Sequence, residues 1–279
     1  MNHRISRRTL FGAAAAAAAS GLPAAHAACR SPMPEAFDEM HDVIVVGSGF
    51  AGLSAALAAK LAGADVLVID KMAFIGGNSS LSGGMIAVPG SSVQKAQGVK
   101  DSPEALEADM ERIGQGLGDP AHIRFLCTDA ADAFEWTKKE MGVDWQTNLT
   151  GKGGHSASRC LITKQGTGQG IIVPASARLK SLGVELRTKC FMQEIIRDDD
   201  GRVKGLRVRE GYVFGKPQSG KVRTIGARRA VVLACGGFGA DVKYRSRLDP
   251  KLGAAFKTTN QPGATSEAWR EASRIGANI

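Results

Sequence analysis

The stretch from His41 to Gly52, HDVIVVGSGFAG, constrains the fold of this chain more than any other segment. The β-branched run Val43 to Val46 is typical of a strand that is buried on both faces. The G-x-G-x-x-G pattern that follows allows a tight turn from the strand into a helix, and it lets the backbone approach phosphate groups closely. The small residues of 53–61 favour a helix that packs tightly on a sheet.

A second strand and an acid complete this unit. The apolar run Val66 to Ile69 ends at Asp70, where a carboxylate can accept hydrogen bonds from a ribose. The glycine pattern alone is weak, but strand, glycines, helix, strand and acid occur in order within about 30 residues, the length of one β-α-β unit. A glycine-rich turn without a ligand is therefore disfavoured. We predict an α/β, Rossmann-like site for an adenine dinucleotide, with these candidate residues: Gly47, Ser48, Gly49, Ala51, Gly52 and Asp70.

The segment from Lys71 to Met85 indicates which dinucleotide binds. It contains four glycines, one amide and three hydroxyl side chains, whereas a nicotinamide-binding domain normally continues from the acid into an ordinary helix. Bare backbone and short donors suit a longer ligand whose phosphates and ring lie against the main chain. The candidate residues of this segment are Lys71, Gly77, Asn78, Ser79, Gly83 and Gly84.

Five motifs resemble those of the fumarate reductase/flavocytochrome c family of FAD-dependent oxidoreductases. They are DVIVVGSGFAG, VLVIDK, IGGNSSLSGG, VVLACGGFG and TTNQPGAT, and the resemblance extends from about residue 42 to residue 279. It implies a glutathione-reductase-type FAD-binding domain that reduces an activated C=C bond, such as that of fumarate or another enoate, by hydride transfer from the flavin. It also implies that the backbone of Met192 contacts adenine and that Ala234 and Gly236 lie beside the cofactor. Because the loop 76–84 has no histidine, FAD is expected to bind non-covalently.

The chain departs from the family pattern at two places. Cys235 stands where the family usually has threonine, so a hydroxyl donor is lost. Ser266 and Glu267 replace the usual Gly-Asp, although Glu267 could substitute for the acid. In the family, the lid domain and the catalytic residues follow the TTNQPGAT segment. The sequence ends at Ile279, so we expect a domain that is incomplete relative to the family, without the lid domain, and we predict no catalytic residue and no metal ligand.

The first 27 residues resemble a twin-arginine export signal. Arg7 and Arg8 precede the alanine run 13–19, and the Ala25-His26-Ala27 sequence is typical of a cleavage site. The apolar run is too short to span a membrane. We therefore expect a periplasmic product without a membrane span, in which 28–41 is a lead-in and 42–279 is the FAD-binding domain.

The composition of the chain indicates which kinds of ligand and partner it could bind. Charged residues make up 23% of the chain and hydrophobic residues 43%, as in soluble enzymes. Loss of three arginines with the signal lowers the formal charge from +9 to +6, a mild excess that would attract a small carboxylate substrate. Basic residues are scattered, which argues against nucleic acid. The five cysteines include no C-x-x-C-H haem motif, so electrons would come from a separate cytochrome c or other donor. We expect the cysteines to be buried thiols.

The rest of the sequence predicts further elements. A helical insertion is expected over about 101–150, with helix starts at Asp101–Glu104 and Asp119–Pro120 and with Trp136 and Trp145 as packing residues. A helix, a strand, a hairpin and a buried strand are predicted at 171–182, 183–187, 192–208 and 230–234. The segment 91–100 is expected to be irregular.

A second glycine-rich loop covers 151–170. Its polar groups best suited to reach a ligand are His155 and Arg159, an interpretation that the sequence balances against simple exposure to solvent.

Two other functions stay open. The chain could be a non-catalytic FAD-binding fragment of a split or truncated flavoprotein. It could also be a ketosteroid dehydrogenase-like flavoenzyme with an enone substrate, because those enzymes share the flavin motifs. The export signal and the NQPGAT segment argue against the second alternative.

Overall fold

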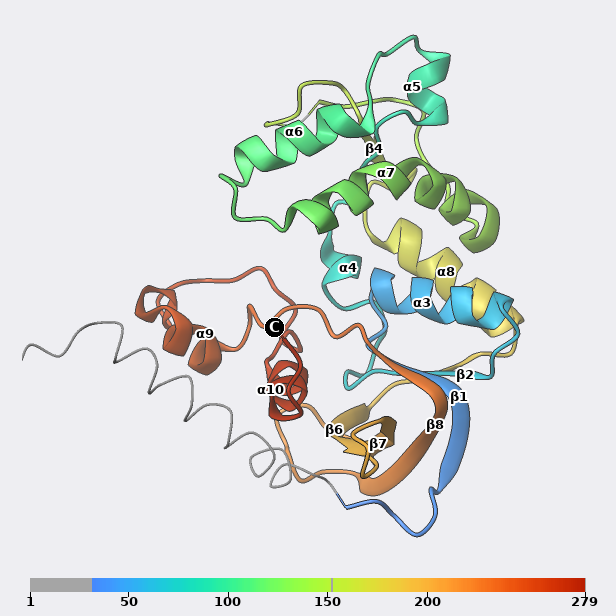
Figure 1. Cartoon of the computed structure of the whole chain (residues 1–279), viewed down its shortest axis with the longest axis vertical. Helices are drawn as coiled ribbons and strands as arrows, with labels where there is room; N and C mark the ends of the chain where they lie inside the picture. The colour runs from blue at the N-terminus through green and yellow to red at the C-terminus, as the bar shows by residue number, and fades with distance from the viewer. Residues whose placement is uncertain (1–31, 152, 279) are drawn as a thin grey trace, which may run out of the picture.

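The computed structural model describes residues 32–151 and 153–278 (Figure 1). The proposed signal peptide, with Arg7, Arg8 and the 25–27 cleavage site, lies outside these residues. The predicted β-α-β unit is present as β1 (Glu39–Val46), α3 (Phe50–Leu61) and β2 (Val66–Ile69). Strand β1 begins before the predicted end of the lead-in, because Glu39, Met40 and His41 already pair with β8.

The largest sheet of the described residues has six strands, in the order β5-β2-β1-β8-β7-β6. β5 (Glu185–Arg187), β2, β1 and β8 (Lys221–Leu233) run parallel, while β7 (Val203–Glu210) and β6 (Cys190–Arg197) are joined to β8 as an antiparallel meander. Strand β8 is longer than the predicted 230–234 because its first half pairs with β7 and its second half with β1. The hairpin is confirmed, with slightly longer strands.

The side chains of Val43 to Val46 in β1 point alternately into two hydrophobic clusters, one on each face of the sheet. This explains why all four residues of the run are apolar. Val43 and Val45 pack toward α3 and α8 (Gln169–Ser181), and these two helices lie next to each other on one face of the sheet (Figure 1). Ile44 and Val46 pack on the opposite side against residues of β6, β7 and β8. A strand with both faces covered has no polar positions to alternate with apolar ones.

The helical insertion stands apart from the sheet, at the top of Figure 1. It comprises α5 (Ser92–Ala96), α6 (Pro103–Ile113), α7 (Pro120–Trp136) and the π-helical turn Thr137–Met141. Both predicted helix starts are confirmed. The Ser102 hydroxyl accepts from the amide of Ala105, and the Asp119 carboxylate caps α7 in the same way.

Two predicted loops contain short regular elements. Helix α5 forms within the segment predicted to be irregular, because Ser91 and Gln94 make a capping box. Strand β4 (Cys160–Ile162) lies inside the second glycine-rich loop and pairs with β3 (Met85–Ala87).

The tryptophans of the insertion pack as predicted. The rings of Phe134 and Trp145 have their centroids 5.6 Å apart, and the Trp145 indole Nε1 donates to the Thr137 hydroxyl at 3.0 Å. Trp136 packs against the core beneath α3 and α8.

The C-terminal part of the chain returns to the sheet. It forms α9 (Val242–Leu248), a 3₁₀ turn (Pro250–Leu252) and α10 (Glu267–Arg274). Helix α10 contacts β6, where the backbone amide of Ile195 donates to the Glu271 carboxylate at 2.6 Å. Among the described residues, no helix combines the length and the apolar character that a membrane crossing requires.

Candidate cofactor cleft

A cleft of about 390 Å³ opens where the parallel strands β1, β2 and β8 end. Ligands of open α/β sheets bind at this edge, beyond the carboxyl ends of the strands. Most of the residues predicted from the sequence line it: Gly47, Ser48, Gly49, Ala51, Asp70, Lys71, Gly77, Asn78, Ser79, Met192, Ala234 and Gly236. The structure therefore brings together segments that are almost 190 residues apart in the sequence.

The three glycines of the turn have three different roles. Gly47 has φ +106°, and a Cβ atom there would lie 2.3 Å from the carbonyl oxygen of Ala234. A Cβ on Gly52 would lie 1.9 Å from the Gly47 carbonyl, so the third glycine lets α3 pack on the turn. Gly49 has an ordinary φ of −70° and lines the cleft at the amino end of α3. The positive end of the helix dipole therefore faces the cleft, as an anionic ligand requires.

Gly52, Gly83 and Gly84 do not line this cleft. Gly52 is buried within α3, and Gly84 has φ +62° with its Cβ position 2.3 Å from the carbonyl oxygen of Thr167. Gly84 thus joins the first glycine-rich segment to the second one. A spacing pattern does not separate glycines that allow close packing from glycines that border a ligand.

Asp70 lies at the end of β2 as predicted, but its carboxylate already has partners inside the protein. It accepts hydrogen bonds from the amide and the hydroxyl of Ser48 and from the amide of Met72. Ser48 is 1% exposed. The sequence predicts both residues as cofactor contacts and contains no signal that they bind each other.

The loop around α4 (Gly77–Leu81) is tied to the rest of the cleft wall. The Ser79 hydroxyl accepts from the amide of Phe50 at 3.0 Å, which connects this loop to the start of α3. The Asn78 carboxamide bonds to the TTNQPGAT segment: its Oδ1 accepts from the amide of Gln261 at 2.7 Å and its Nδ2 donates to the Asn260 side chain.

Gln261 also lines the cleft and was not predicted from the sequence as a site residue. Its Oε1 accepts from the amide of Gly263 at 3.0 Å, which fixes the orientation of the carboxamide. Within residues 32–151 and 153–278, the Gln261 Nε2 is buried and has no hydrogen-bond partner. A buried donor without a partner is costly, so this atom indicates a wall built to meet an additional polar group.

Two charged residues that line the cleft, Lys71 and Glu267, form an ion pair. The Lys71 ammonium lies 2.9 Å from the Glu267 carboxylate, and the Thr265 hydroxyl bonds to both groups. Burial alone would raise the pKa of Glu267, but the Thr265 hydrogen bond and the Lys71 charge outweigh it and hold the pKa below its ordinary value. Glu267 therefore lines the cleft as a charged acid.

The β8 end and the β6 strand complete the wall. The Cys235 thiol lies 3.4 Å from the carbonyl oxygen of Val46, and burial raises its pKa to about 11. Met192 is buried on β6 and lines the cleft. Cys127 and Cys190 are buried thiols, as expected, and burial also raises the pKa of Cys190 to about 12.

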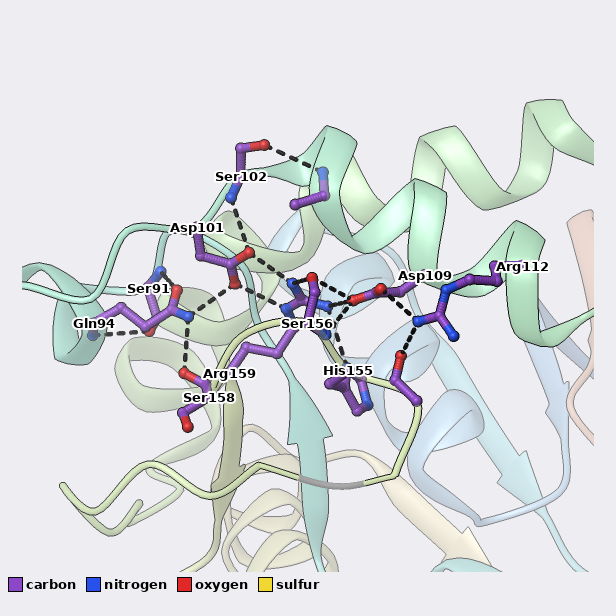
Figure 2. A network of polar contacts seen from close by, with 12 residues as sticks. Ser91, Gln94, Asp101, Ser102, Asp109, Arg112, His155, Ser156, Ser158 and Arg159 are labelled. Carbon is purple, nitrogen blue, oxygen red and sulfur yellow. Dashed lines mark hydrogen bonds and ion pairs between the residues drawn. The ribbon is translucent and has the colours of Figure 1, made fainter.

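His155 and Arg159 do not line the cleft. Figure 2 shows both of them in a network of polar contacts instead. Arg159 is fully buried in the helical insertion, where its guanidinium pairs with Asp101 and Asp109. The His155 Nδ1 lies 3.3 Å from the same guanidinium. The sequence leaves open whether Arg159 reaches a ligand, and in the structure its guanidinium has a structural role, because carboxylates from another segment take up its donors. In the described part of the chain, no cluster of three or more His, Cys, Asp or Glu side chains could hold a metal ion.

Comparison with known proteins gives consistent matches. The family model described as "FAD binding domain" matches residues 42–279. The acrylate reductase flavoprotein subunit of Shewanella woodyi is 39% identical over 272 residues, which are 97% of this chain and 54% of that protein.

Among solved structures, the open conformation of a flavocytochrome c3 fumarate reductase superposes with a TM-score of 0.80 at 28% identity, over 99% of this chain and 44% of that one. A 3-ketosteroid-delta4-(5alpha)-dehydrogenase from Rhodococcus jostii RHA1 gives a TM-score of 0.76 at 26% identity, over 89% and 56%. The chain thus spans about half the length of these relatives.

Proposed function

Because the chain belongs to the FAD-binding domain family of fumarate-reductase-type flavoproteins, we propose that its cleft binds FAD non-covalently. The reaction that we propose for this flavoprotein is the reduction of a C=C bond. The substrate class we propose is a small unsaturated carboxylate such as acrylate or fumarate. When bound, FAD supplies the redox chemistry, taking up electrons and passing a hydride to the substrate. The residues of this chain bind and orient the cofactor.

The observation that carries the proposal is the meeting of the glycine turn, Asp70 and the Asn78–Gln261 wall around one cleft. The amino end of α3 would face the diphosphate, since Gly49 leaves the space for it. The β2 end would take the adenosine ribose, and Met192 lies where a strand could contact the base. The Gln261 Nε2 offers a donor that lacks a partner in the described part of the protein.

The cofactor assignment is tested first. Purified protein is titrated with FAD, and binding is followed by quenching of the flavin fluorescence and by the visible flavin spectrum after gel filtration. We expect stoichiometric retention of FAD that is released on denaturation, because the proposed link is non-covalent. A protein that remains colourless at saturating FAD would refute the proposed site.

The substrate class is tested next with reduced viologen as electron donor. Oxidation of the dye is measured with acrylate, fumarate, urocanate and a ketosteroid as acceptors, on the FAD-loaded protein. The proposal requires turnover with an enoate. Turnover with the ketosteroid alone would instead select the dehydrogenase-like alternative.

A second candidate, an FAD-binding protein without catalysis of its own, is favoured by one specific observation. Among the described residues that line the cleft, none is a histidine or an arginine, the side chains that most readily hold a substrate carboxylate. FAD retention without turnover on any of the four acceptors would select this candidate.

We further propose export by the twin-arginine route and reduction by a separate electron donor such as a cytochrome c. The support for export is the sequence of residues 1–27, which lie outside the described residues, and the support for a separate donor is confined to these 279 residues, which contain no haem-attachment motif. Replacing both Arg7 and Arg8 by lysine should retain the protein in the cytoplasm. Unchanged delivery to the periplasm would contradict this route.

A further inference from the structure

The hydroxyl group of Ser48 links three segments of the cleft through two hydrogen bonds. It donates to the Asp70 Oδ2 at 2.5 Å and accepts from the amide of Gly76 at 3.0 Å. A serine hydroxyl has one proton to donate, so its direction is settled by the carboxylate, which only accepts. The glycine turn, the end of β2 and the entry to α4 are thereby joined at one buried atom.

The surroundings of this hydroxyl are buried and constrained. Ser48 is 1% exposed, and Gly76 is buried as well. Gly76 has φ +105°, and a Cβ atom there would lie 1.8 Å from the Ser80 hydroxyl oxygen, so the backbone at this point is strongly constrained. Removing the Ser48 hydroxyl would leave the buried Gly76 amide without its partner and would take from the Asp70 Oδ2 one of the two hydrogen bonds that it accepts. Leaving a buried donor unpaired costs more than the bond itself contributes.

The bonds at Asp70 limit what it can still accept. A carboxylate offers about four acceptor positions. The Ser48 amide at 3.0 Å and the Ser48 hydroxyl occupy Oδ2, and the Met72 amide at 2.9 Å occupies one position on Oδ1. Among the described residues, the bonds found at this carboxylate thus leave a single position, on Oδ1.

We propose that Ser48 is a positioning residue that fixes Asp70 so that Oδ1 accepts one ribose hydroxyl, not both, from the adenosine part of FAD. This inference rests on the proposed cofactor site. A free acid at the end of this strand could turn to receive both hydroxyls of the ribose diol. The three hydrogen bonds that Asp70 accepts fix the direction of its free Oδ1 position. This position can accept one ribose hydroxyl, and removal of the other hydroxyl should not change binding.

The first test compares two serine-to-alanine variants in the same region. Ser48→Ala removes the linking hydroxyl. Ser54→Ala is the matched control, because the Ser54 hydroxyl donates only to the Phe50 carbonyl within α3. We expect Ser48→Ala to raise the Kd for FAD by about tenfold or more, and Ser54→Ala to leave it unchanged. Equal FAD affinity of Ser48→Ala and the unaltered protein would overturn the inference.

The second test has a readout that a purely structural role would not move. ADP, 2′-deoxy-ADP and 3′-deoxy-ADP compete with FAD for the unaltered protein, and their inhibition constants are compared. One deoxy analogue should bind about tenfold more weakly than ADP and the other within about twofold of it. In Asp70→Asn the difference between the analogues should shrink, which also covers the case that Ser48→Ala does not fold. Equal losses for both analogues would show that Asp70 receives both hydroxyls.

A wrong cofactor site and a wrong role for Ser48 would give different results. If the unaltered protein does not bind FAD, the proposed cofactor site is wrong. If it binds FAD while Ser48→Ala and the deoxy analogues behave like their controls, only the role of Ser48 is wrong.

Discussion

Arg159 and Asp101 form a bidentate ion pair inside the helical insertion, with Nε to Oδ2 at 2.8 Å and Nη2 to Oδ1 at 2.7 Å (Figure 2). Both side chains are fully buried. A third member, Asp109, lies 2.6 Å from Nη1 and also accepts from the amide of Ser156. These bonds hold the pKa of the Asp109 carboxyl well below its ordinary value. The residue before β4 is thereby fastened to the residue pair that precedes α6 and to α6 itself.

We predict that Arg159→Met destabilises the protein by about 3–5 kcal/mol, because it leaves Asp101 in the interior without its cation and removes one of the two cations that pair with Asp109. The measurement is urea unfolding followed by circular dichroism. The matched control is Arg112→Met. Arg112 also bonds to Asp109, but its side chain is 58% exposed, so the expected loss is below about 1 kcal/mol. Similar losses for the two variants would contradict a buried network.

Arg159 also illustrates which contacts cannot be predicted from the sequence. The β-α-β unit could be identified because its signals lie within one stretch: an apolar run, spaced glycines and a terminal acid. Arg159, in contrast, has its partners Asp101 and Asp109 about 50 residues away, and no local pattern relates them. In isolation, an arginine beside a histidine in a glycine-rich loop is equally typical of ligand contact.

The sequence likewise predicts some features of the cofactor cleft and not others. The sequence predicts most of the segments that meet there, since they carry glycines or an acid at a strand end, while the segment of Met192 is predicted from the family resemblance alone. It does not predict the contacts between them, such as Ser48 with Asp70 or Asn78 with Gln261. These bonds depend on the relative positions of the loops, which the sheet order sets and the local sequence does not.

Gly49→Val is expected to abolish FAD retention. Gly49 has an ordinary φ of −70°, so backbone strain does not require glycine at this position. The space does: a Cβ atom would lie 3.2 Å from the Ser79 hydroxyl oxygen, and a branched side chain would extend into the cleft. The flavin absorbance that co-elutes with the protein on gel filtration measures the loss.

The control for this variant is Gly63→Ala. Gly63 has φ +83° and no atom within 4 Å of its Cβ position, so alanine introduces backbone strain of about 1 kcal/mol without touching the cleft. It should lower the melting temperature slightly and keep the flavin. Flavin retention by Gly49→Val at the level of Gly63→Ala would show that the cofactor does not pass over Gly49.

Stability at low pH should depend on Glu39. Both Glu39 oxygens accept from Arg187 at 2.8 Å, and these bonds lower the pKa of Glu39 from 4.5 to about 2. Because the folded-state pKa lies below the ordinary value, the stabilisation is present above pH 4.5 and is lost as the pH falls toward 2. Glu39→Gln should cost about 1–3 kcal/mol at pH 7.

The comparison of Glu39→Gln with the unaltered protein by urea unfolding at several pH values tests the sign. The difference between the two should shrink steadily below pH 4.5. The exposed Glu111 provides the control, because Glu111→Gln should change the unfolding free energy little at any pH. A difference that stays constant down to the acid transition would show that the Arg187 pair does not govern this titration.

Lys71 and Glu267 should affect FAD binding in opposite directions. Among the described residues lining the cleft, Lys71 is the single basic side chain, and it is paired with Glu267 at 2.9 Å. The diphosphate of FAD carries two negative charges, so Lys71→Met should weaken binding. Glu267→Gln removes a negative charge from the cleft and releases Lys71, so it should tighten FAD binding by about threefold to tenfold at low salt.

Salt separates this electrostatic account from a direct contact between Glu267 and the cofactor. If the gain in Glu267→Gln comes from the field of Lys71, it should diminish as the ionic strength rises from about 0.01 M to about 1 M, over which the screening length falls about tenfold. The double variant Lys71→Met/Glu267→Gln should lose the gain altogether, because no cation is left to release. Weaker binding by Glu267→Gln at every salt concentration would mean instead that the carboxylate accepts a hydrogen bond from FAD, as an acid at this position can.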